Sequence, residues 1–450
     1  MSAALEAQVA PAPAPRVSGA YRAWVLFILV AVYTFNFIDR QIVGILAVPI
    51  KADLALSDTQ LSLMGGLAFA LFYTFLGIPI AWLADRKSRT WIMTAALAIW
   101  SAMTAACGLT QNFIQLFLAR LGVGIGEAGG VAPAYSLISD YFPSNQRARA
   151  LGIYSFGIPI GSALGIVLGG ILNDLIGWRA AFLIVGAMGL TLAPVFRLTM
   201  REPKRGQYDP PTAKSEPAPI KEVVATLLRK KSFWLMSLGA ASSSMMGYGL
   251  IFWLPSFFVR SFGEELPGFF SWLPDFLVPQ NAGPVLYASY FYGTILLTGG
   301  LVGIWAGGAL ADRYGAKSKS AYALTPAIAF LATIPFFLVG VLSTSLPLTF
   351  LAFLAIQALS LVWLGPVLCA FQHLVGPNMR ATASAIFLFI NNLIGIGLGN
   401  LIIGALSDAF AARFAAESLR YAILSGIVFY VLAAGFFIFT APRLKRDWEG

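Results

Sequence analysis

The chain consists of long apolar stretches separated by short polar connections. A bilayer core about 30 Å thick requires about 20 helical residues to cross it. Only helices are expected there, because lipid offers backbone groups no hydrogen-bonding partner. We therefore predict an all-α membrane protein with twelve transmembrane helices, at about residues 23–46, 59–83, 91–109, 113–138, 149–171, 179–199, 233–261, 285–311, 320–342, 346–372, 382–409 and 420–441.

The polar segments divide these helices into two groups of six. Residues 200–232 are basic and proline-containing, which predicts a solvated cytoplasmic linker between a half at 23–199 and a half at 233–441. Residues 1–22 include an Ala/Pro run typical of a disordered tail, and residues 442–450 are expected to form a second tail. The first apolar segment is too long for a cleaved signal peptide and lacks a small-residue cleavage site.

Charge and composition support a membrane location. Of the 450 residues 58% are apolar and 11% charged, whereas a soluble domain carries about 25% charged residues. The net charge of +10 does not indicate nucleic-acid binding, because the charges cluster between apolar runs. Most Lys and Arg fall on the side of both termini, so we expect both termini in the cytoplasm. The short loops without an Asn-x-Ser/Thr sequon favour a bacterial inner membrane, and we expect a monomer.

The content of metal-ligating residues is low. His373 is the single histidine, and no cysteine cluster accompanies it, so we expect no metal site. Cys107 and Cys369 are predicted at opposite membrane faces and should not pair. We expect no cofactor, with protons as the coupling ion.

A short motif repeats at the same point of each half. Leu83-Ala84-Asp85-Arg86 follows the second predicted helix, and Leu310-Ala311-Asp312-Arg313 follows the eighth. This repeat resembles the loop motif of the major facilitator superfamily, a family of transporters, although Ala81 and Ser88 stand where glycine is usual. The resemblance implies a gate at the cytoplasmic face, with Asp85 near the start of the helix at Thr382. The gate residues it implies are Asp85, Arg86, Asp312, Arg313, Arg147 and Arg149.

A narrower resemblance lies in the first half. Residues 36–40 (Asn-Phe-Ile-Asp-Arg), 120–128 and 158–162 resemble the spinster branch of this superfamily. Eukaryotic members of that branch are associated with export of sphingosine-1-phosphate and transport of lysophospholipids. The resemblance therefore implies an amphipathic, lipid-like substrate.

Four charged residues lie well away from the ends of the predicted helices: Asp39, Arg40, Arg120 and Glu127. A charge at the bilayer centre costs about 2.5–3.5 kcal/mol, so such residues face a cavity or a partner. Asp39 and Arg120 are each about 10 Å from the outer end of their helices, which allows an ion pair. Glu127 follows Arg120 by two turns on the same face. We predict that Asp39 and Glu127 bind coupling protons and that Arg40 and Arg120 bind substrate; a purely structural charge network is the alternative.

The second half offers neutral polar and aromatic residues in its predicted helices. The substrate-binding candidates there are Tyr248, Tyr290, Gln357 and Trp363. A charged wall opposite an aromatic wall suits an amphipathic organic molecule. We therefore expect a proton-coupled secondary transporter that works by alternating access; a carrier of a polar metabolite such as a sugar acid, or of a drug, is the alternative. A membrane enzyme would require clustered His, Asp and Glu, and a channel would not require two repeated gate motifs.

One external loop is unusually apolar. Residues 263–284 contain Phe269, Phe270 and Trp272, and aromatic rings are favoured at the membrane interface. We expect this loop to lie in the interface, where it could guard a lateral entry for lipid; packing on the helix bundle is the alternative.

Overall fold

The computed structural model is helical through nearly all of the residues it describes, which are 18–84, 86–205, 219–274, 277–278, 282–315, 317–376 and 379–448. The first half contains α1 (Gly19–Ile45), α2 (Ala47–Leu54), α3 (Asp58–Ser62), α4 (Ala68–Ala84), α5 (Arg89–Cys107), α6 (Phe113–Glu127), α7 (Val131–Tyr141), α8 (Ser144–Ser155) and α9 (Gly157–Thr199). The second contains α10 (Ile220–Arg229), α11 (Lys231–Phe262), α12 (Leu266–Phe269), α13 (Pro284–Gly315), α14 (Ala321–Leu342), α15 (Leu346–Leu361), α16 (Leu364–Gln372), α17 (Arg380–Phe414), α18 (Ser418–Ser425) and α19 (Ile427–Asp447).

These helices account for twelve membrane crossings. Within the described residues, ten helical stretches are long and apolar enough to span a bilayer, and two of them, Ala150–Thr199 and Thr382–Asp447, hold 50 and 66 residues. The first bends inside α9 at Gly177, whose φ of 81° is accessible mainly to glycine. The second breaks after α17, at Ala415. Each therefore crosses twice, and the twelve-helix prediction is confirmed.

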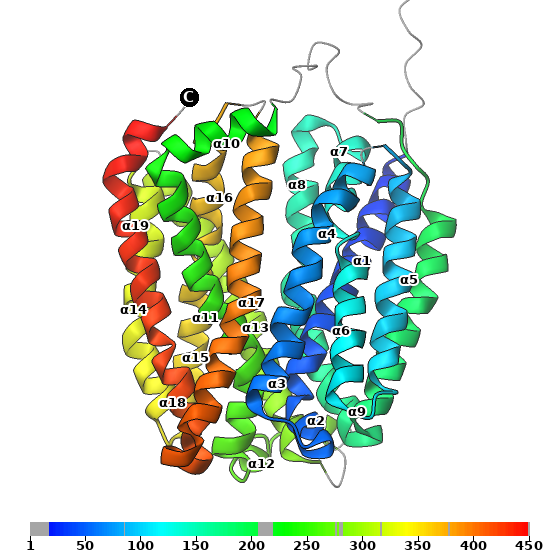
Figure 1. Ribbon diagram of the computed structural model, residues 1–450, viewed down its shortest axis with the longest axis vertical. Helices are drawn as coiled ribbons and strands as arrows, with labels where there is room; N and C mark the ends of the chain where they lie inside the picture. The colour runs from blue at the N-terminus through cyan, green and yellow to red at the C-terminus, as the bar shows by residue number, and fades with distance from the viewer. Residues whose placement is uncertain are drawn as a thin grey trace, which may run out of the picture.

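The two halves stand side by side (Figure 1). The start of α1 and the end of α19 lie at one face, which we call the terminal face, together with α10. The opposite face carries α2, α3, α12 and α18 (Figure 1). At the opposite face α3 contacts α17 of the second half directly.

Small residues set the distance between α1 and α9. Glycines recur at every fourth position of α9 from Gly157 to Gly169 and face α1, and a Cβ added at Gly165 would lie 2.8 Å from the Cα of Ile38. Only glycine allows this separation, so the stripe serves close helix packing, as small-residue repeats do in membranes. This contact fixes the rotation of α1 about its axis and thereby the direction of its charged residues.

Both described ends of the predicted solvated linker at 200–232 pack against the helix bundle. Residues 201–205 bind the first half through Glu202 and Arg205, and α10 packs Val223 and Leu227 against the second half. Residues 206–218 lie outside the described part. The predicted C-terminal tail is also shorter, because α19 continues to Asp447. Of the predicted N-terminal tail, residues 1–17 are outside the described part and α1 begins at Gly19.

The apolar loop at 263–284 packs on the helix bundle through part of its aromatic residues. Phe270 stacks on Tyr287 with ring centroids 6.2 Å apart, and Phe269 lies edge-on to Phe291 at 5.4 Å. Trp272 instead is 72% exposed. Residues 275–276 and 279–281 are not described, so its placement in the interface stays a prediction.

Candidate functional site

A buried ion pair links α1 to α6 in the middle of the first half. Arg120 Nη1 donates to Asp39 Oδ1 at 3.1 Å, and the two residues are 1% and 2% exposed. The Thr104 hydroxyl on α5 donates to the second oxygen of Asp39. The equal depth of Asp39 and Arg120 on their helices predicted this pair, and the structure contains it. Thr104 gave no signal in the sequence, because its part depends on how α5 packs.

A second ion pair lies beside the first. Arg40 Nε donates to Glu127 Oε2 at 2.7 Å, and Glu127 is fully buried. Neighbouring residues on a helix point about 100° apart, so Asp39 and Arg40 meet different residues of α6. Sequence reasoning placed Glu127 on the same face as Arg120 but did not find Arg40 as its partner.

Aromatic rings enclose the Arg40 guanidinium. Its central carbon lies 4.8 Å from the Phe69 ring centre and 4.6 Å from the Tyr73 ring centre, distances that allow cation–π attraction. Tyr248 of α11 packs against the same apolar cluster. The predicted residues Asp39, Arg40, Arg120, Glu127 and Tyr248 are therefore gathered at one place where both halves contribute.

Several buried polar atoms at this place have no hydrogen-bond partner among the described residues. They are Glu127 Oε1, Arg40 Nη2, Arg120 Nε and both amide atoms of Asn36. A cavity of about 10 Å³ borders Asn36, lined by Tyr33, Trp100 and Tyr154 among others, which is near the minimum for one water molecule. Buried polar atoms without a hydrogen bond are costly, so these atoms mark a place suited to water, protons or a ligand.

The other candidates of the second half lie elsewhere. The Tyr290 hydroxyl donates to the Leu277 carbonyl at 2.6 Å, in the apolar loop at 263–284. Gln357 packs against Gly299 of α13, and Trp363 sits in the break between α15 and α16 with 7% exposure. The structure therefore does not bring these three residues to the ion pairs. It adds a pair that the sequence did not reveal, in which Ser244 donates to Asn391 Oδ1 at 2.9 Å.

A third charged group joins the halves at the opposite face. The Asp58 carboxylate accepts from Arg260 of α11 at 2.8 and 3.0 Å and from Lys51 at 2.6 Å. Asp408 of α17 accepts from the backbone amides of Asp58 and Thr59 at 3.1 and 2.8 Å. These amides lie at the start of α3 and have no acceptor within the helix, and the helix dipole favours negative charge there. We call Asp58, Arg260 and Asp408 the outer lock; the sequence analysis did not identify it.

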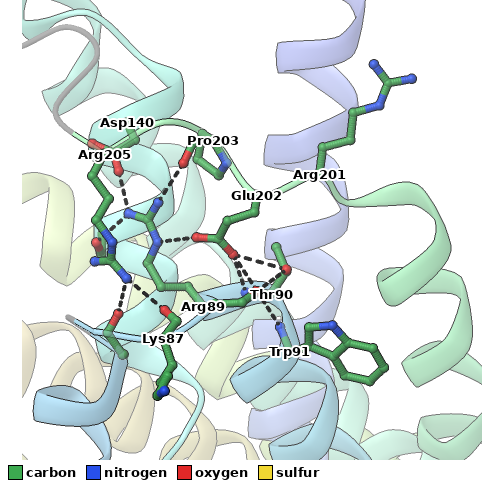
Figure 2. A network of polar contacts seen from close by, with 12 residues as sticks. Lys87, Arg89, Thr90, Trp91, Asp140, Arg201, Glu202, Pro203 and Arg205 are labelled. Carbon is green, nitrogen blue, oxygen red and sulfur yellow. Dashed lines mark hydrogen bonds and ion pairs between the residues drawn. The ribbon is translucent and has the colours of Figure 1, made fainter.

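At the terminal face, Arg89 connects three segments of the first half (Figure 2). It is 1% exposed and donates to Glu202 at 2.7 Å, to the Pro203 carbonyl at 3.1 Å and to Asp140. Arg205 donates to the Ala84 and Lys87 carbonyls at 2.6 and 2.7 Å. The residues after α9 thus hold the loop that carries the Leu-Ala-Asp-Arg motif.

Glu202 also caps the first turn of α5. Its Oε2 accepts from the Thr90 amide at 3.0 Å and from the Ser88 hydroxyl at 2.9 Å. Partial burial opposes ionisation of Glu202, but the hydrogen bonds from Thr90, Arg89 and Ser88 outweigh it and hold the pKa below its usual value.

The predicted gate residues are only partly described. Asp85 and the side chains of Asp312, Arg147 and Arg149 lie outside the described part. The Arg86 guanidinium stacks on Trp82 at 3.9 Å, and Arg313 lies 5.7 Å from the Tyr314 ring. Both described arginines therefore contact their own segment, and the gate role of the six residues stays a prediction.

Residues 29–400 match the sequence profile described as "Major Facilitator Superfamily". The chain belongs to this superfamily. It is therefore a transporter and not an enzyme. Its fold matches the crystal structure of a bacterial homologue of the human lysosomal transporter Spinster, inward-facing and unoccupied, with a TM-score of 0.85 and 32% identity over 96% of this chain and 100% of that one.

Two protein relatives extend the comparison. An "MFS-type efflux pump" of Mycolicibacterium smegmatis is 32% identical over 434 residues, 95% of each chain. Protein spinster homolog 3 of Danio rerio is 29% identical over 444 residues, 94% of this chain and 86% of the relative. The chain is thus a transporter of the spinster branch, as the motifs of its first half indicated.

Proposed function

We propose that this protein is a proton-coupled carrier of an anionic amphipathic organic molecule of the lysolipid or sphingosine-phosphate type. The observation that carries the proposal is the pair of buried ion pairs, Asp39–Arg120 and Arg40–Glu127, with unpartnered atoms on Arg40, Arg120 and Glu127. Such residues inside a membrane bundle serve ion or substrate pathways. The aromatic rings around Arg40 provide the apolar neighbourhood that the tail of such a molecule requires.

Coupling follows from competition for Arg40. While Arg40 holds Glu127, the carboxylate is compensated and stays ionised. An anionic head group that binds Arg40 removes this compensation and favours uptake of a proton by Glu127. By thermodynamic reciprocity, a proton on Glu127 strengthens binding of the anion. Asp39 and Arg120 form a second pair of the same kind, with Thr104 as an additional donor to the carboxylate.

Alternating access requires that the two faces open in turn. The outer lock closes the opposite face by joining Asp58 to Arg260, and the similar crystal structure is inward-facing. We infer that the structure is the inward-facing state, with the terminal face in the cytoplasm, as the distribution of Lys and Arg indicates. A monomer in a bacterial inner membrane, without cofactor, completes the proposal.

A second candidate function is the export of a polar metabolite or drug. It is favoured by the relative described as an efflux pump, and a guanidinium flanked by aromatic rings also suits many drug-like anions. This candidate uses the same ion pairs and differs in the size of the apolar part of the substrate.

A transport assay in proteoliposomes tests the proposal. Uptake of lysophospholipid, sphingosine phosphate and a sugar acid is measured with and without a pH gradient. The proposal predicts transport of the lipid-like anions, accelerated by the gradient. Transport restricted to the sugar acid would favour the second candidate, and gradient-independent transport would remove proton coupling.

A further inference from the structure

A groove outside the central site opens at the terminal face, between the start of α11 and the end of α19. Its volume is about 320 Å³, and it is lined by Lys231, Trp234, Leu235, Phe439 and Arg443. Two cations from two helices therefore border a pocket whose remaining walls are apolar. Nothing in the transport mechanism above uses these residues.

The lining residues are ordered by depth. Arg443 is one helical turn closer to the terminal face than Phe439 on α19, and Lys231 is about one turn closer than Trp234 and Leu235 on α11. One turn corresponds to about 5.4 Å. The cations thus lie at the rim and the apolar side chains behind them, the order in which a phospholipid presents its phosphate and its acyl chains.

An exposed apolar surface continues from the groove toward the middle of the bundle. Phe439 is 61% exposed, Leu238 of α11 is 37% exposed and Leu432 of α19 is 46% exposed. Exposed large apolar side chains on membrane-spanning helices face lipid. An acyl chain lying along this surface can therefore be continuous with a head group in the groove.

The neighbouring helix α10 places the groove at the level of the lipid head groups. Its Val223 side is buried, whereas Ile220 and Leu228 are 68% and 63% exposed, and it runs across the terminal face (Figure 1). A short helix with apolar residues facing outward and basic residues at its ends lies in the membrane interface. Trp234 Nε1 donates to the Leu227 carbonyl at 3.1 Å, which ties α10 to the groove.

No carboxylate among the described residues compensates the charge of the groove. Among the described residues Lys231 has no carboxylate partner, and the hydrogen bond of Arg443 goes to the Phe439 carbonyl of its own helix. The nearby Asp447 carboxylate is engaged by the amide and hydroxyl of Ser232, at 3.2 and 2.8 Å, and by Arg446. The rim can therefore accept an anion.

From this arrangement we propose that the groove binds an anionic phospholipid of the surrounding leaflet, with its phosphate between Lys231 and Arg443 and an acyl chain along Trp234, Leu235 and Phe439. Basic pockets between helices at this level of a membrane bind acidic head groups. The lipid is a bound component at the edge of the second half and not the transported substrate, because the groove lies apart from the ion pairs of the first half. The inference does not depend on which substrate the carrier moves.

Native mass spectrometry of the full-length protein with added phosphatidylglycerol or phosphatidylcholine tests this site. Each basic residue near an anionic lipid contributes roughly fivefold in affinity, so Lys231→Gln with Arg443→Gln should weaken phosphatidylglycerol binding about 30-fold and abolish the preference over phosphatidylcholine. Lys317→Gln with Lys445→Gln removes the same charge from exposed positions outside the groove and should change the affinity less than twofold. The charge-conserving pair Lys231→Arg with Arg443→Lys should keep most of the binding.

Equal losses in the two neutralised variants would overturn the proposal, since they would show a general effect of surface charge. Unchanged binding in the groove variant would overturn it as well. Millimolar inorganic phosphate should not displace the lipid; displacement would identify a phosphate site without a lipid component. If the double variant does not fold, Arg443→Gln alone should weaken binding about fivefold, and an unchanged affinity would contradict the proposal.

Discussion

The two halves share one fold but differ in what they bury. All buried charged residues among those described belong to the first half; they are Asp39, Asp58, Arg89, Arg120, Glu127 and Asp140. The second half buries only neutral polar residues, such as the Ser244–Asn391 pair. Burying a charge is costly unless it is paired, so the first half carries ion pairs that its own packing does not require. The difference supports our proposal that the charge-dependent steps belong to the first half, opposite a largely neutral wall of the second half.

The repeated motif shows the same divergence at the terminal face. In the first copy, Arg89 is buried and binds Asp140 and Glu202. In the loop that follows the second copy, Lys317 is exposed. Two loops with the same Leu-Ala-Asp-Arg sequence are therefore held in different ways, and the first is the more firmly fixed.

Removing a buried charge should have the largest effect. Arg120→Ala leaves Asp39 buried without its cation, and breaking a buried ion pair costs about 3–5 kcal/mol. We expect a strongly destabilised protein that no longer transports anionic substrates, measured by thermal unfolding and by uptake in proteoliposomes. Ser244→Ala removes a neutral pair of the second half and should cost only about 1 kcal/mol.

Asp39→Asn combined with Arg120→Gln separates folding from function. Without charge on either residue, the double variant should recover much of the lost stability but no transport of anions. Stability that stays as low as in Arg120→Ala would show that the pair acts through packing, and the contrast between the halves would lose its electrostatic basis.

Breaking the outer lock should have an intermediate effect, because the lock joins a carboxylate of the first half, Asp58, to a cation of the second half, Arg260. Arg260→Gln removes the bidentate partner of Asp58 but leaves Lys51 and Ser407 bound to it. Loss of about 1.4 kcal/mol would change the population of the closed outer face tenfold. Labelling of a single cysteine placed at Leu56 by a membrane-impermeant reagent should become about tenfold faster.

Arg413→Gln provides the control for that measurement. Arg413 stands near the same face, and its described contact is with the Phe414 ring, 5.3 Å away. Its removal should leave the labelling rate unchanged. Equal rates in wild type and Arg260→Gln would show that the outer lock does not hold the face closed.

The smallest effect is expected at Glu202. Glu202→Gln weakens the hydrogen bonds to Arg89 and to the first turn of α5, at a cost of about 1 kcal/mol at neutral pH. Because the pKa of Glu202 is held below its usual value in the folded protein, its stabilising effect is present above the unfolded pKa and is lost as the pH falls through the folded one. The difference in melting temperature between wild type and variant should therefore be constant from pH 6 to 8 and shrink below about pH 4.5. A difference that shrinks already near pH 6 would contradict this assignment.

The membrane-spanning pattern and one ion pair could be predicted from the sequence. Apolar length reports each crossing directly, and Asp39 and Arg120 could be matched because depth along a helix is proportional to residue count. The boundaries shifted mainly where helices extend past the apolar stretch, as at Asp447.

The remaining contacts depend on tertiary packing. Arg40 meets Glu127 because α9 fixes the rotation of α1, which residue spacing does not reveal. Thr59 and Asp408 are 349 residues apart, and Arg89 and Glu202 are 113 apart, so their registers follow only from how the helices assemble. The direction of the Tyr290 hydroxyl toward the Leu277 carbonyl likewise follows only from packing.

The central claim is that Glu127 couples transport to protons by competing with the substrate for Arg40. The most direct measurement is the rate of anionic lysolipid transport by Glu127→Gln in proteoliposomes, with and without a pH gradient, beside substrate binding to the same variant. The account predicts that binding is retained and that the gradient no longer changes the rate, while Asn391→Ala of the second half keeps its full dependence on the gradient. A Glu127→Gln protein whose transport still responds fully to the gradient would contradict the account and assign Glu127 a structural role.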